Sequence, residues 1–294
     1  MYKKILIASL ALIAGLASCK KDDPTPSPNP PSGLTIDGVA STLEFYQLDT
    51  AHLSVAGVAK DAAAKAVWAV NGAKAAEGAT FDFTTAHPGK YEVTLTVDGK
   101  SAKHTYTVAP RFSEGAFLLN EGNSGNETGS LTYIHPSKKL VIDQAYYRIN
   151  GTKLGNVCQD LAFENDQIYI LSQLGPKNGG EGLLTIARSN SLEKVKIYND
   201  EALAQSTPTH IAVLRDHIYI RTERDGILRG SSEGGFTPIT GTKKALKQRM
   251  AQIGERIFAL TKDNKILMIQ GTQVVRELDL SPAKPSGIAV SHDG

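Results

Sequence analysis

An internal repeat in the second half of the chain constrains the fold more than any other feature of the sequence. Four short segments carry an alanine beside an apolar residue near their start and end on an acidic residue. They span residues 160–166, 210–216, 249–255 and 287–293, and their alanines are spaced by 50, 39 and 38 residues. Repeats of this length are typical of proteins that stack copies of one small structural unit. We therefore expect a stacked fold here.

Further strand-like segments follow each repeat start at similar distances. A second strand is predicted at residues 167–170, 217–220 and 256–259, and a third at 184–187, 226–229 and 265–269. A fourth is predicted at 273–278. Four short strands in about 40–45 residues are the pattern of one blade of a β-propeller. The sequence therefore predicts a β-propeller over residues 110–294.

The last repeat stops early, because the chain ends at Gly294, where its second strand would begin. From Gly115 onward we count about four blades, the first without its inner strand, whereas propellers close with about 4–8. An open arc would leave unpaired strand edges. We therefore expect a truncated propeller that lacks about three blades of a larger ring. A closed ring of four blades is the alternative.

The region before the repeat, residues 34–109, is predicted to form an all-β sandwich. Residues 91–97 alternate apolar and polar side chains, which is the pattern of a strand with one buried face. Asn71-Gly72 and Asp98-Gly99 are typical of hairpin turns. A tryptophan on one strand and a tyrosine on a later one, here Trp68 and Tyr91, are typical of an immunoglobulin-like core. The segments around them resemble bacterial PKD domains, which implies a protein-contact module; a mechanical spacer is the alternative.

The N-terminus resembles the export signal of a bacterial lipoprotein. Lys3 and Lys4 precede an apolar stretch, residues 5–16, that is too short to span a bilayer core of about 30 Å. Leu16-Ala17-Ser18-Cys19 resembles a lipobox. This resemblance implies a signal peptide over residues 1–18 and a lipid anchor on Cys19. An ordinary signal peptide with an incidental cysteine is the alternative.

The residues after Cys19 suggest a destination. Lys20-Lys21-Asp22-Asp23 resembles the signal that sends lipoproteins of the Bacteroidota to the cell surface, although a solvated charge cluster has the same composition. Prolines then dominate up to Gly33, so residues 19–33 are expected to form an extended linker. We expect an outer-membrane protein that is exposed at the cell surface and anchored through Cys19.

Composition excludes several classes of partner and site. The chain has 32 basic and 30 acidic residues, and two of the lysines would leave with the signal peptide. A neutral mature chain gives no electrostatic reason to expect a nucleic-acid partner. Cys19 and Cys158 are the only cysteines, so with Cys19 lipidated neither an internal disulfide nor a cysteine-based metal site is expected. Cys158 is expected to be a small buried side chain.

One ordered series of motifs resembles a known family. It consists of Gly115–Asn123, Gly129–Tyr133, Asn150-Gly151, Leu154–Val157, Gln159-Asp160 and the ending Pro285–Gly294. Together these motifs resemble the YncE-like β-propeller surface lipoproteins of the Bacteroidota. The resemblance covers residues 115–294 and implies a ring of seven blades. Some members of that family capture cobalamin and pass it to a TonB-dependent transporter in the outer membrane.

No catalytic or cofactor motif stands out in the chain. A zinc-protease His-Glu-x-x-His, a hydrolase Gly-x-Ser-x-Gly and a P-loop are all missing from the sequence. The glycine-rich segment 175–182 lacks the Gly-Lys-Ser/Thr that binds phosphate, and it is expected to be a loop between strands. The seven histidines have no metal-ligand spacing. We therefore expect a binding protein without a cofactor or metal, and not an enzyme.

The candidate binding site lies on one face of the expected propeller. Loops that enter the inner strands and loops between second and third strands share that face, and they carry amide, acidic and basic side chains. The candidates are Asn120, Glu121, Asn123, Asn156, Gln159, Asp160, Gln173, Thr209, His210, Arg221, Arg224, Gln248 and Arg249. Arginine makes paired contacts with phosphate or carboxylate. The set suits a large polar ligand such as a corrinoid, although such side chains also serve to satisfy loop backbone.

The sequence is compatible with two functions. The first is capture of a nutrient, such as a corrinoid, for a TonB-dependent transporter. The alternative is adhesion, in which the protein contacts glycans or other proteins and has no small-molecule ligand.

Overall fold

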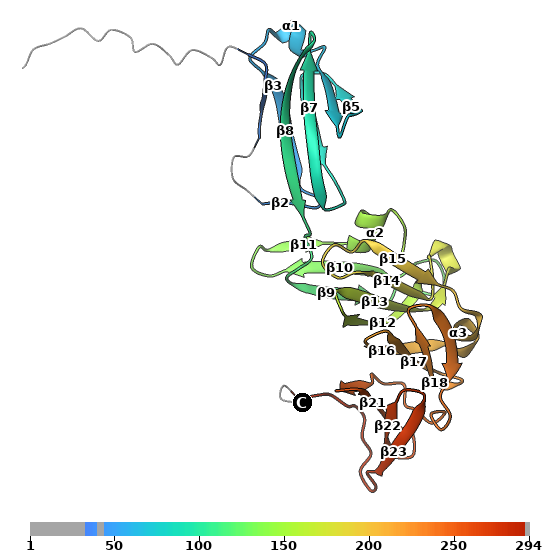
Figure 1. The fold of residues 1–294 in the computed structure, drawn as a ribbon. Coiled ribbons are helices and arrows are strands. Elements are labelled where there is room, and N and C mark those ends of the chain that lie inside the picture. Colours follow the sequence, from blue (N-terminus) through green and yellow to red (C-terminus); the bar gives the residue numbers. More distant parts are fainter. Residues whose placement is uncertain (1–32, 40–43, 292–294) are drawn as a thin grey trace, which may run out of the picture.

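The protein is all-β, with short helices between some of the sheets (Figure 1). A computed structural model describes residues 33–39 and 44–291. The expected signal peptide, the lipidation site Cys19, nearly all of the linker and residues 292–294 lie outside the described residues. Within the described ranges, no helix is both long and apolar enough to cross a membrane.

The N-terminal part consists of two sheets that pack face to face. One sheet has the strand order β1-β3-β6 and the other has the order β2-β8-β7-β4-β5. The strands are β1 (Thr35–Asp37), β2 (Phe45–Tyr46), β3 (Thr50–Ala56), β4 (Val67–Val70), β5 (Ala73–Glu77), β6 (Thr80–Thr84), β7 (Gly89–Val97) and β8 (Lys100–Ala109), and the short helix α1 is Lys60–Ala63. Figure 1 shows β7 and β8 as the long strands of this part.

The core of this sandwich forms where the sequence predicts it. Trp68 is fully buried and lies 5.6 Å, ring to ring, from Phe81 of the opposite sheet. Asn71 and Asp98 have positive φ, as do the glycines that follow them, which is the backbone conformation of a tight hairpin turn.

Four antiparallel sheets follow, each a meander of strands that are consecutive in the sequence. The first has three strands, β9 (Ala116–Asn120), β10 (Ser130–His135) and β11 (Leu140–Ile142). The second comprises β12 (Asn156–Glu164), β13 (Gln167–Gly175), β14 (Leu184–Arg188) and β15 (Lys194–Tyr198). The third comprises β16 (Pro208–Leu214), β17 (His217–Thr222), β18 (Gly226–Ser231) and β19 (Gly234–Pro238), and the fourth β20 (Ala251–Ile253), β21 (Arg256–Leu260), β22 (Lys265–Gln270) and β23 (Gln273–Asp279).

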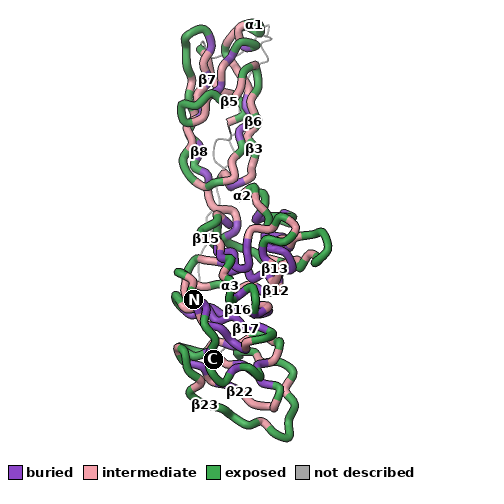
Figure 2. The backbone as a smooth tube through the Cα atoms, turned by 90° about the vertical axis from the view of Figure 1, so that its right-hand side faces the viewer, coloured by how far each residue is buried: buried purple, intermediate pink, exposed green. Residues whose placement is uncertain are grey.

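Each meander sheet packs on the next, and successive side chains of its second strand point to opposite neighbours. In β13, Ile168 and Ile170 contribute to the core against the first sheet, whereas Tyr169 and Leu171 contribute to the core against the third. In β17, Tyr219 points to the fourth sheet. Because both faces are covered, the middle of each of these strands is continuously apolar, at residues 168–171 and 218–220. Figure 2 shows the buried residues concentrated in the second and third sheets.

The strands agree with the first three copies of the repeat, and the differences lie in its last copy and in the segments that connect strands. Every second and third strand predicted from the repeat lies inside an observed one, and so does the fourth at residues 273–278. The prediction for the last repeat is wrong, because residues 287–290 form no strand. Besides α1, three short helices were not predicted from the sequence: α2 (Ala145–Asn150), α3 (Glu201–Ser206) and η1 (Lys177–Gly179), which lies in the glycine-rich segment. The first two precede the inner strands of the second and third sheets.

Gln47 joins the sandwich to the meander sheets. Its side chain is fully buried, and its Nε2 donates to the carbonyl of Ala86 at 2.6 Å and to that of Ser191 at 3.0 Å. Its Oε1 accepts from the backbone N–H of Arg111 at 3.1 Å. One amide therefore satisfies three backbone groups, buried or partly buried, from both parts of the molecule. His87 and Glu193 add a bond of 3.0 Å across the same joint.

We predict that Gln47→Ala lowers the free energy of unfolding by about 2–4 kcal/mol, because it leaves buried backbone groups without partners. Denaturant unfolding followed through the fluorescence of Trp68 measures this. Lys103→Ala, which removes an exposed ion pair with Glu92, is the control and should leave the midpoint unchanged. An equal effect of the two variants would show that the joint does not depend on Gln47.

Candidate ligand-binding site at the inner strands

Three residues at equivalent positions of the repeat approach one another where the inner strands begin. Asp160 lies in β12, His210 in β16, and Arg249 two residues before β20. Asp160 Oδ1 accepts a bond of 2.6 Å from Arg249 Nη2, and its Oδ2 accepts one of 3.2 Å from the backbone N–H of Ile211. Asp160 Oδ1 also accepts from the N–H of Leu161 at 2.9 Å. One carboxylate therefore links three sheets.

The two ends of this ion pair differ in exposure. The side chain of Asp160 is 2% exposed, whereas that of Arg249 is 68% exposed. A buried carboxylate is tolerated only where donors compensate its charge, and here a guanidinium and two backbone N–H groups do so. Since Asp160 engages only one nitrogen of Arg249, the remaining donors of that guanidinium face solvent.

A hollow of about 190 Å³ lies beside this ion pair. It is bounded by the inner strands of three sheets. Its lining residues are Asp160, Leu161, Ala162, Phe163, Ile211, Ala212, Val213, Arg249, Met250 and Gln252. Figure 1 shows β12 and β16 side by side at this level. Most of these residues are apolar, but the surface that they present to the hollow is largely polar, and the Asp160–Arg249 ion pair is part of it.

Arg221 serves the fold instead of the open rim that the sequence suggested. It is 4% exposed, and its Nη2 and Nε donate to the carbonyl of Ala245 at 3.1 and 3.4 Å. Its Nη1 donates to Thr209 Oγ1 at 3.2 Å. Burial lowers the pKa of Arg221, against the opposing effect of the Glu223 carboxylate. An arginine keeps its charge even so, and its donors are used by the protein.

His210 is a neutral side chain within this basic neighbourhood. Burial lowers its pKa, and the positive charges of Arg221, Arg249 and Lys247 act in the same direction, whereas Asp160 opposes them. Its Nδ1 lies 3.2 Å from Thr209 Oγ1, whose proton goes to the carbonyl of Arg221. Since that hydroxyl proton is already used, Nδ1 carries the hydrogen in this bond and Nε2 keeps its lone pair.

A second group of predicted residues is held by the loop between β9 and β10. Gln159 Nε2 donates to Glu121 Oε1 at 2.8 Å, which connects this loop to β12. The Oδ1 of Asn123 accepts from two backbone N–H groups of its own loop. Asn156 is fully buried and donates to the carbonyls of Asn123 and Glu127 at 2.9 and 2.7 Å. Asn123 and Asn156 therefore shape the loop.

The remaining predicted residues are distributed between these two groups. Asn120 donates to Ser130 and Thr132 within the first sheet, and Gln173 to the carbonyl of Pro208 at 3.4 Å. Arg224 is exposed and Gln248 is half-buried. The structure thus brings Asp160, Thr209, His210, Arg221 and Arg249 together, and it leaves Asn120 and Gln173 in bonds within or between sheets.

Two charged residues of this rim, Lys247 and Glu223, were not predicted from the sequence. Lys247 is exposed and donates to Glu223 at 3.0 Å, and its charge acts on His210. The position of Lys247, two residues before Arg249 in the same loop, could have indicated that it belongs to the rim. The rim therefore has three exposed basic side chains, Arg224, Lys247 and Arg249, and one acidic partner, Glu223, at its edge.

Neither a metal-binding cluster nor an activated cysteine is found among the described residues. No group of three histidine, cysteine or acidic side chains in the described ranges is arranged to bind a metal ion. Cys158 is buried, as expected, and burial raises the pKa of its thiol to about 11. A thiol that stays protonated near neutral pH is a poor nucleophile.

Comparison with known proteins places the meander sheets in one family. The family model described as a domain of unknown function (DUF5074) matches residues 114–294, which contain all four meander sheets and exclude the sandwich. None of the curated proteins matches the sequence.

Several solved structures are similar to the chain in fold. A quinoprotein alcohol dehydrogenase-like protein of Bacteroides thetaiotaomicron is 13% identical, with 88% of this chain and 77% of that chain covered and a TM-score of 0.42. A nidogen/laminin complex gives 9% identity, coverage of 77% and 82%, and a TM-score of 0.42. The apo form of AztD from Citrobacter koseri gives 11% identity, coverage of 83% and 75%, and a TM-score of 0.34.

We predict that Arg221→Ala destabilises the fold by about 1–3 kcal/mol, because three charged hydrogen bonds to buried acceptors are lost. Chemical denaturation measures the change. Arg224→Ala, at an exposed arginine in the neighbouring turn, is the matched control and should unfold like the unmodified protein. If both variants unfold at the same denaturant concentration, Arg221 has no structural role.

Proposed function

Since the chain belongs to the family described as a domain of unknown function (DUF5074), we propose that it is a ligand-binding lipoprotein of the cell surface. The proposed ligand site is the rim around Asp160, His210 and Arg249 together with the hollow beneath it. The protein would hold its ligand without changing it chemically. The hydrogen bonds and charges of the rim support binding as its role.

We propose that the architecture is an immunoglobulin- or PKD-like sandwich at residues 34–109 followed by a β-propeller of the YncE-like type at 110–294. Two packed sheets of three and five strands support the first assignment. Four consecutive meander sheets that pack face to face, with their first strands on the inside, support the second. Ligands of such rings bind where loops from several blades converge.

The exposed guanidinium of Arg249 is the observation that carries this proposal. It is oriented by the buried Asp160 and keeps free donors at the entrance of the hollow. Arg224 and Lys247 add positive charge nearby, and His210 offers a neutral acceptor. A fixed arginine favours phosphate or carboxylate groups, since it can donate two parallel bonds. A ligand with a phosphate and amide groups would match this rim. A corrinoid carries both.

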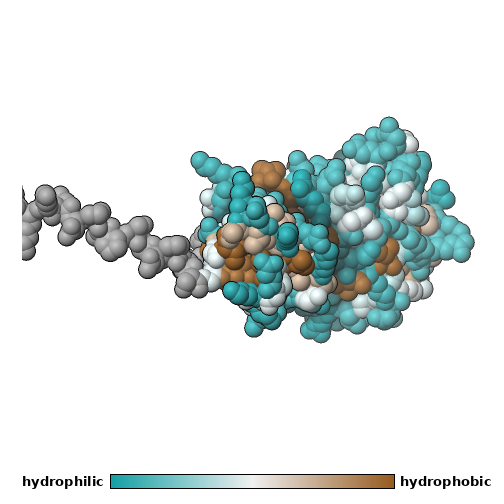
Figure 3. Space-filling view, turned by 90° about the horizontal axis from the view of Figure 1, so that it is seen from above, coloured by the Kyte–Doolittle hydropathy of each residue, from teal (hydrophilic) through white to brown (hydrophobic). Residues whose placement is uncertain are grey.

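Anchoring would place this site outside the cell. A lipid on Cys19 and the proline-rich linker would hold the folded part above the outer membrane, and a TonB-dependent transporter would receive the ligand. The face of the folded part seen from the sandwich end is largely hydrophilic, as expected for a protein surrounded by water (Figure 3). The sandwich would serve as a spacer or as the surface that contacts the transporter.

Calorimetric titration with cobalamin of the chain from Lys20 onward tests the proposal. We predict saturable binding of one cobalamin per chain, and about tenfold weaker binding by Arg249→Ala, because a charge-assisted bond to the ligand phosphate is lost. Arg224→Ala combined with Lys247→Ala should also weaken binding.

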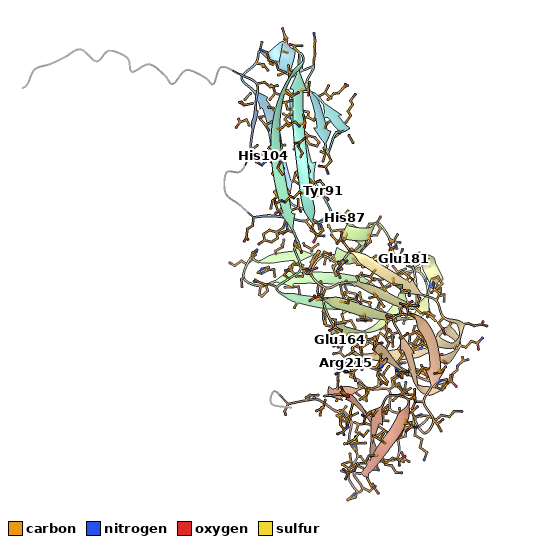
Figure 4. All side chains as sticks on the ribbon, viewed as in Figure 1. His87, Tyr91, His104, Glu164, Glu181 and Arg215 are labelled. Carbon is orange, nitrogen blue, oxygen red and sulfur yellow. The ribbon has the colours of Figure 1, made fainter. Side chains whose placement is uncertain are left out.

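Arg215→Ala is the matched control. Arg215 is as exposed as Arg249, and it also pairs with a carboxylate at 2.6 Å, that of Glu255. It lies in the turn at the opposite end of the inner strand, beside Glu164 (Figure 4). It should bind cobalamin normally. No heat of binding with the unmodified chain would refute corrinoid capture, and equal loss in the Arg215 and Arg249 variants would refute the assignment to the rim.

A further inference from the structure

A second cavity lies beside helix α2, and it shares no lining residue with the hollow at the inner strands. Its volume is about 140 Å³. The loop between β9 and β10, the start of β10, helix α2 and the segment before β12 enclose it. The side chains that matter for binding are Asn126, Glu127, Gln144, Tyr147 and Lys153.

Two polar side chains at this cavity have no partner in the part of the chain that the structure describes. Gln144 and Lys153 are exposed and make neither a side-chain hydrogen bond nor an ion pair there. Glu127 accepts one long bond of 3.4 Å from Asn123 Nδ2, which leaves most of its carboxylate free. A cavity beside the fourth sheet is lined by three lysines, and two of them, Lys244 and Lys265, are paired with acids.

Tyr147 gives the cavity an apolar surface. Its side chain is 46% exposed, although its neighbour Tyr146 is buried in the core. Helix α2 presents these tyrosines in different directions because consecutive residues of a helix point to different sides. An exposed aromatic ring with free amide, ammonium and carboxylate groups around it offers one apolar face and several hydrogen bonds.

The frame of the cavity is held firmly. Tyr146 donates to Glu181 Oε2 at 3.0 Å, and Glu181 also pairs with Lys194 at 2.6 Å. The N–H of Glu181 donates to the carbonyl of Lys153 at 3.2 Å. Figure 4 shows Glu181 below helix α2, on the side of the second sheet. On the loop side, Asn156 binds the carbonyl of Glu127. Such a preformed site loses little conformational entropy on binding.

From these groups we propose that the cavity binds one ring of a neutral carbohydrate. A volume of about 140 Å³ corresponds to about five waters, which is the size of a single sugar ring and well below that of a drug-sized ligand. Glu127 and Lys153 cancel in charge, so a neutral ligand is favoured over an anion. The C–H face of the ring would stack on Tyr147, and its hydroxyls would bind Gln144, Glu127 and Lys153. The site would let the protein contact surface glycans, independently of ligand capture at the rim.

Saturation-transfer NMR on the chain from Lys20 onward tests this proposal. The probes are the methyl glycosides of glucose, galactose, mannose, fucose and N-acetylglucosamine. At least one of them should receive saturation at its ring C–H protons, with about millimolar affinity. Tyr147→Ala should weaken that binding at least tenfold, whereas Tyr147→Phe should retain it because the ring remains.

Two further variants separate this site from other surfaces. Leu118→Ala removes an exposed apolar side chain from β9, 53% exposed, and should leave the sugar signal unchanged. Arg249→Ala should also leave it unchanged, because the rim is a different site. Absence of saturation with all five glycosides, or a signal that survives Tyr147→Ala, would overturn the proposal whatever the result with cobalamin.

Discussion

The arrangement of the meander sheets depends on one buried carboxylate. Asp160 is nearly inaccessible to solvent, and a charge in that position must be compensated inside the protein. Its partners are two backbone N–H groups, one of them on the neighbouring inner strand at Ile211, and the guanidinium of Arg249 from the segment before β20. Apolar packing between sheets is not directional. The hydrogen bonds of the Asp160 carboxylate are directional. They fix how β12, β16 and the segment before β20 sit relative to one another.

The same interaction links the fold to the proposed function. To neutralise Asp160, the chain directs Arg249 toward the hollow, where the unused donors of its guanidinium reach solvent. Arg221 is buried, and its N–H groups donate to other groups of the protein instead. The rim would therefore bind an anionic group through Arg249 first, with the exposed bases around it as secondary contacts. The cavity at Tyr147 uses neutral groups and would take a different ligand. The two proposed sites therefore differ in the charge of the ligand that each would bind.

Much of the fold and part of the candidate site could be predicted from the sequence. The features that could not be predicted were missed for physical reasons. The repeat placed the strands well because the part of a strand that is buried on both faces must be continuously apolar, as residues 168–171 are. It also set Asp160, His210 and Arg249 at equivalent positions, which the structure brings together. The burial of Arg221 could not be predicted, since it depends on the carbonyl of Ala245 in a later loop. Helix α2 was missed because six residues carry too little periodicity to indicate a helix.

A double-mutant cycle between Asp160 and Arg249 tests the central role of this carboxylate most directly. The free energy of unfolding would be measured for Asp160→Asn, Arg249→Ala and the double variant. The account predicts that the two changes are not additive and that they differ from their sum by about 1–2 kcal/mol, since each removes the same bond across the inner strands. Additive effects would contradict it, because the two side chains would then stabilise the fold independently of each other.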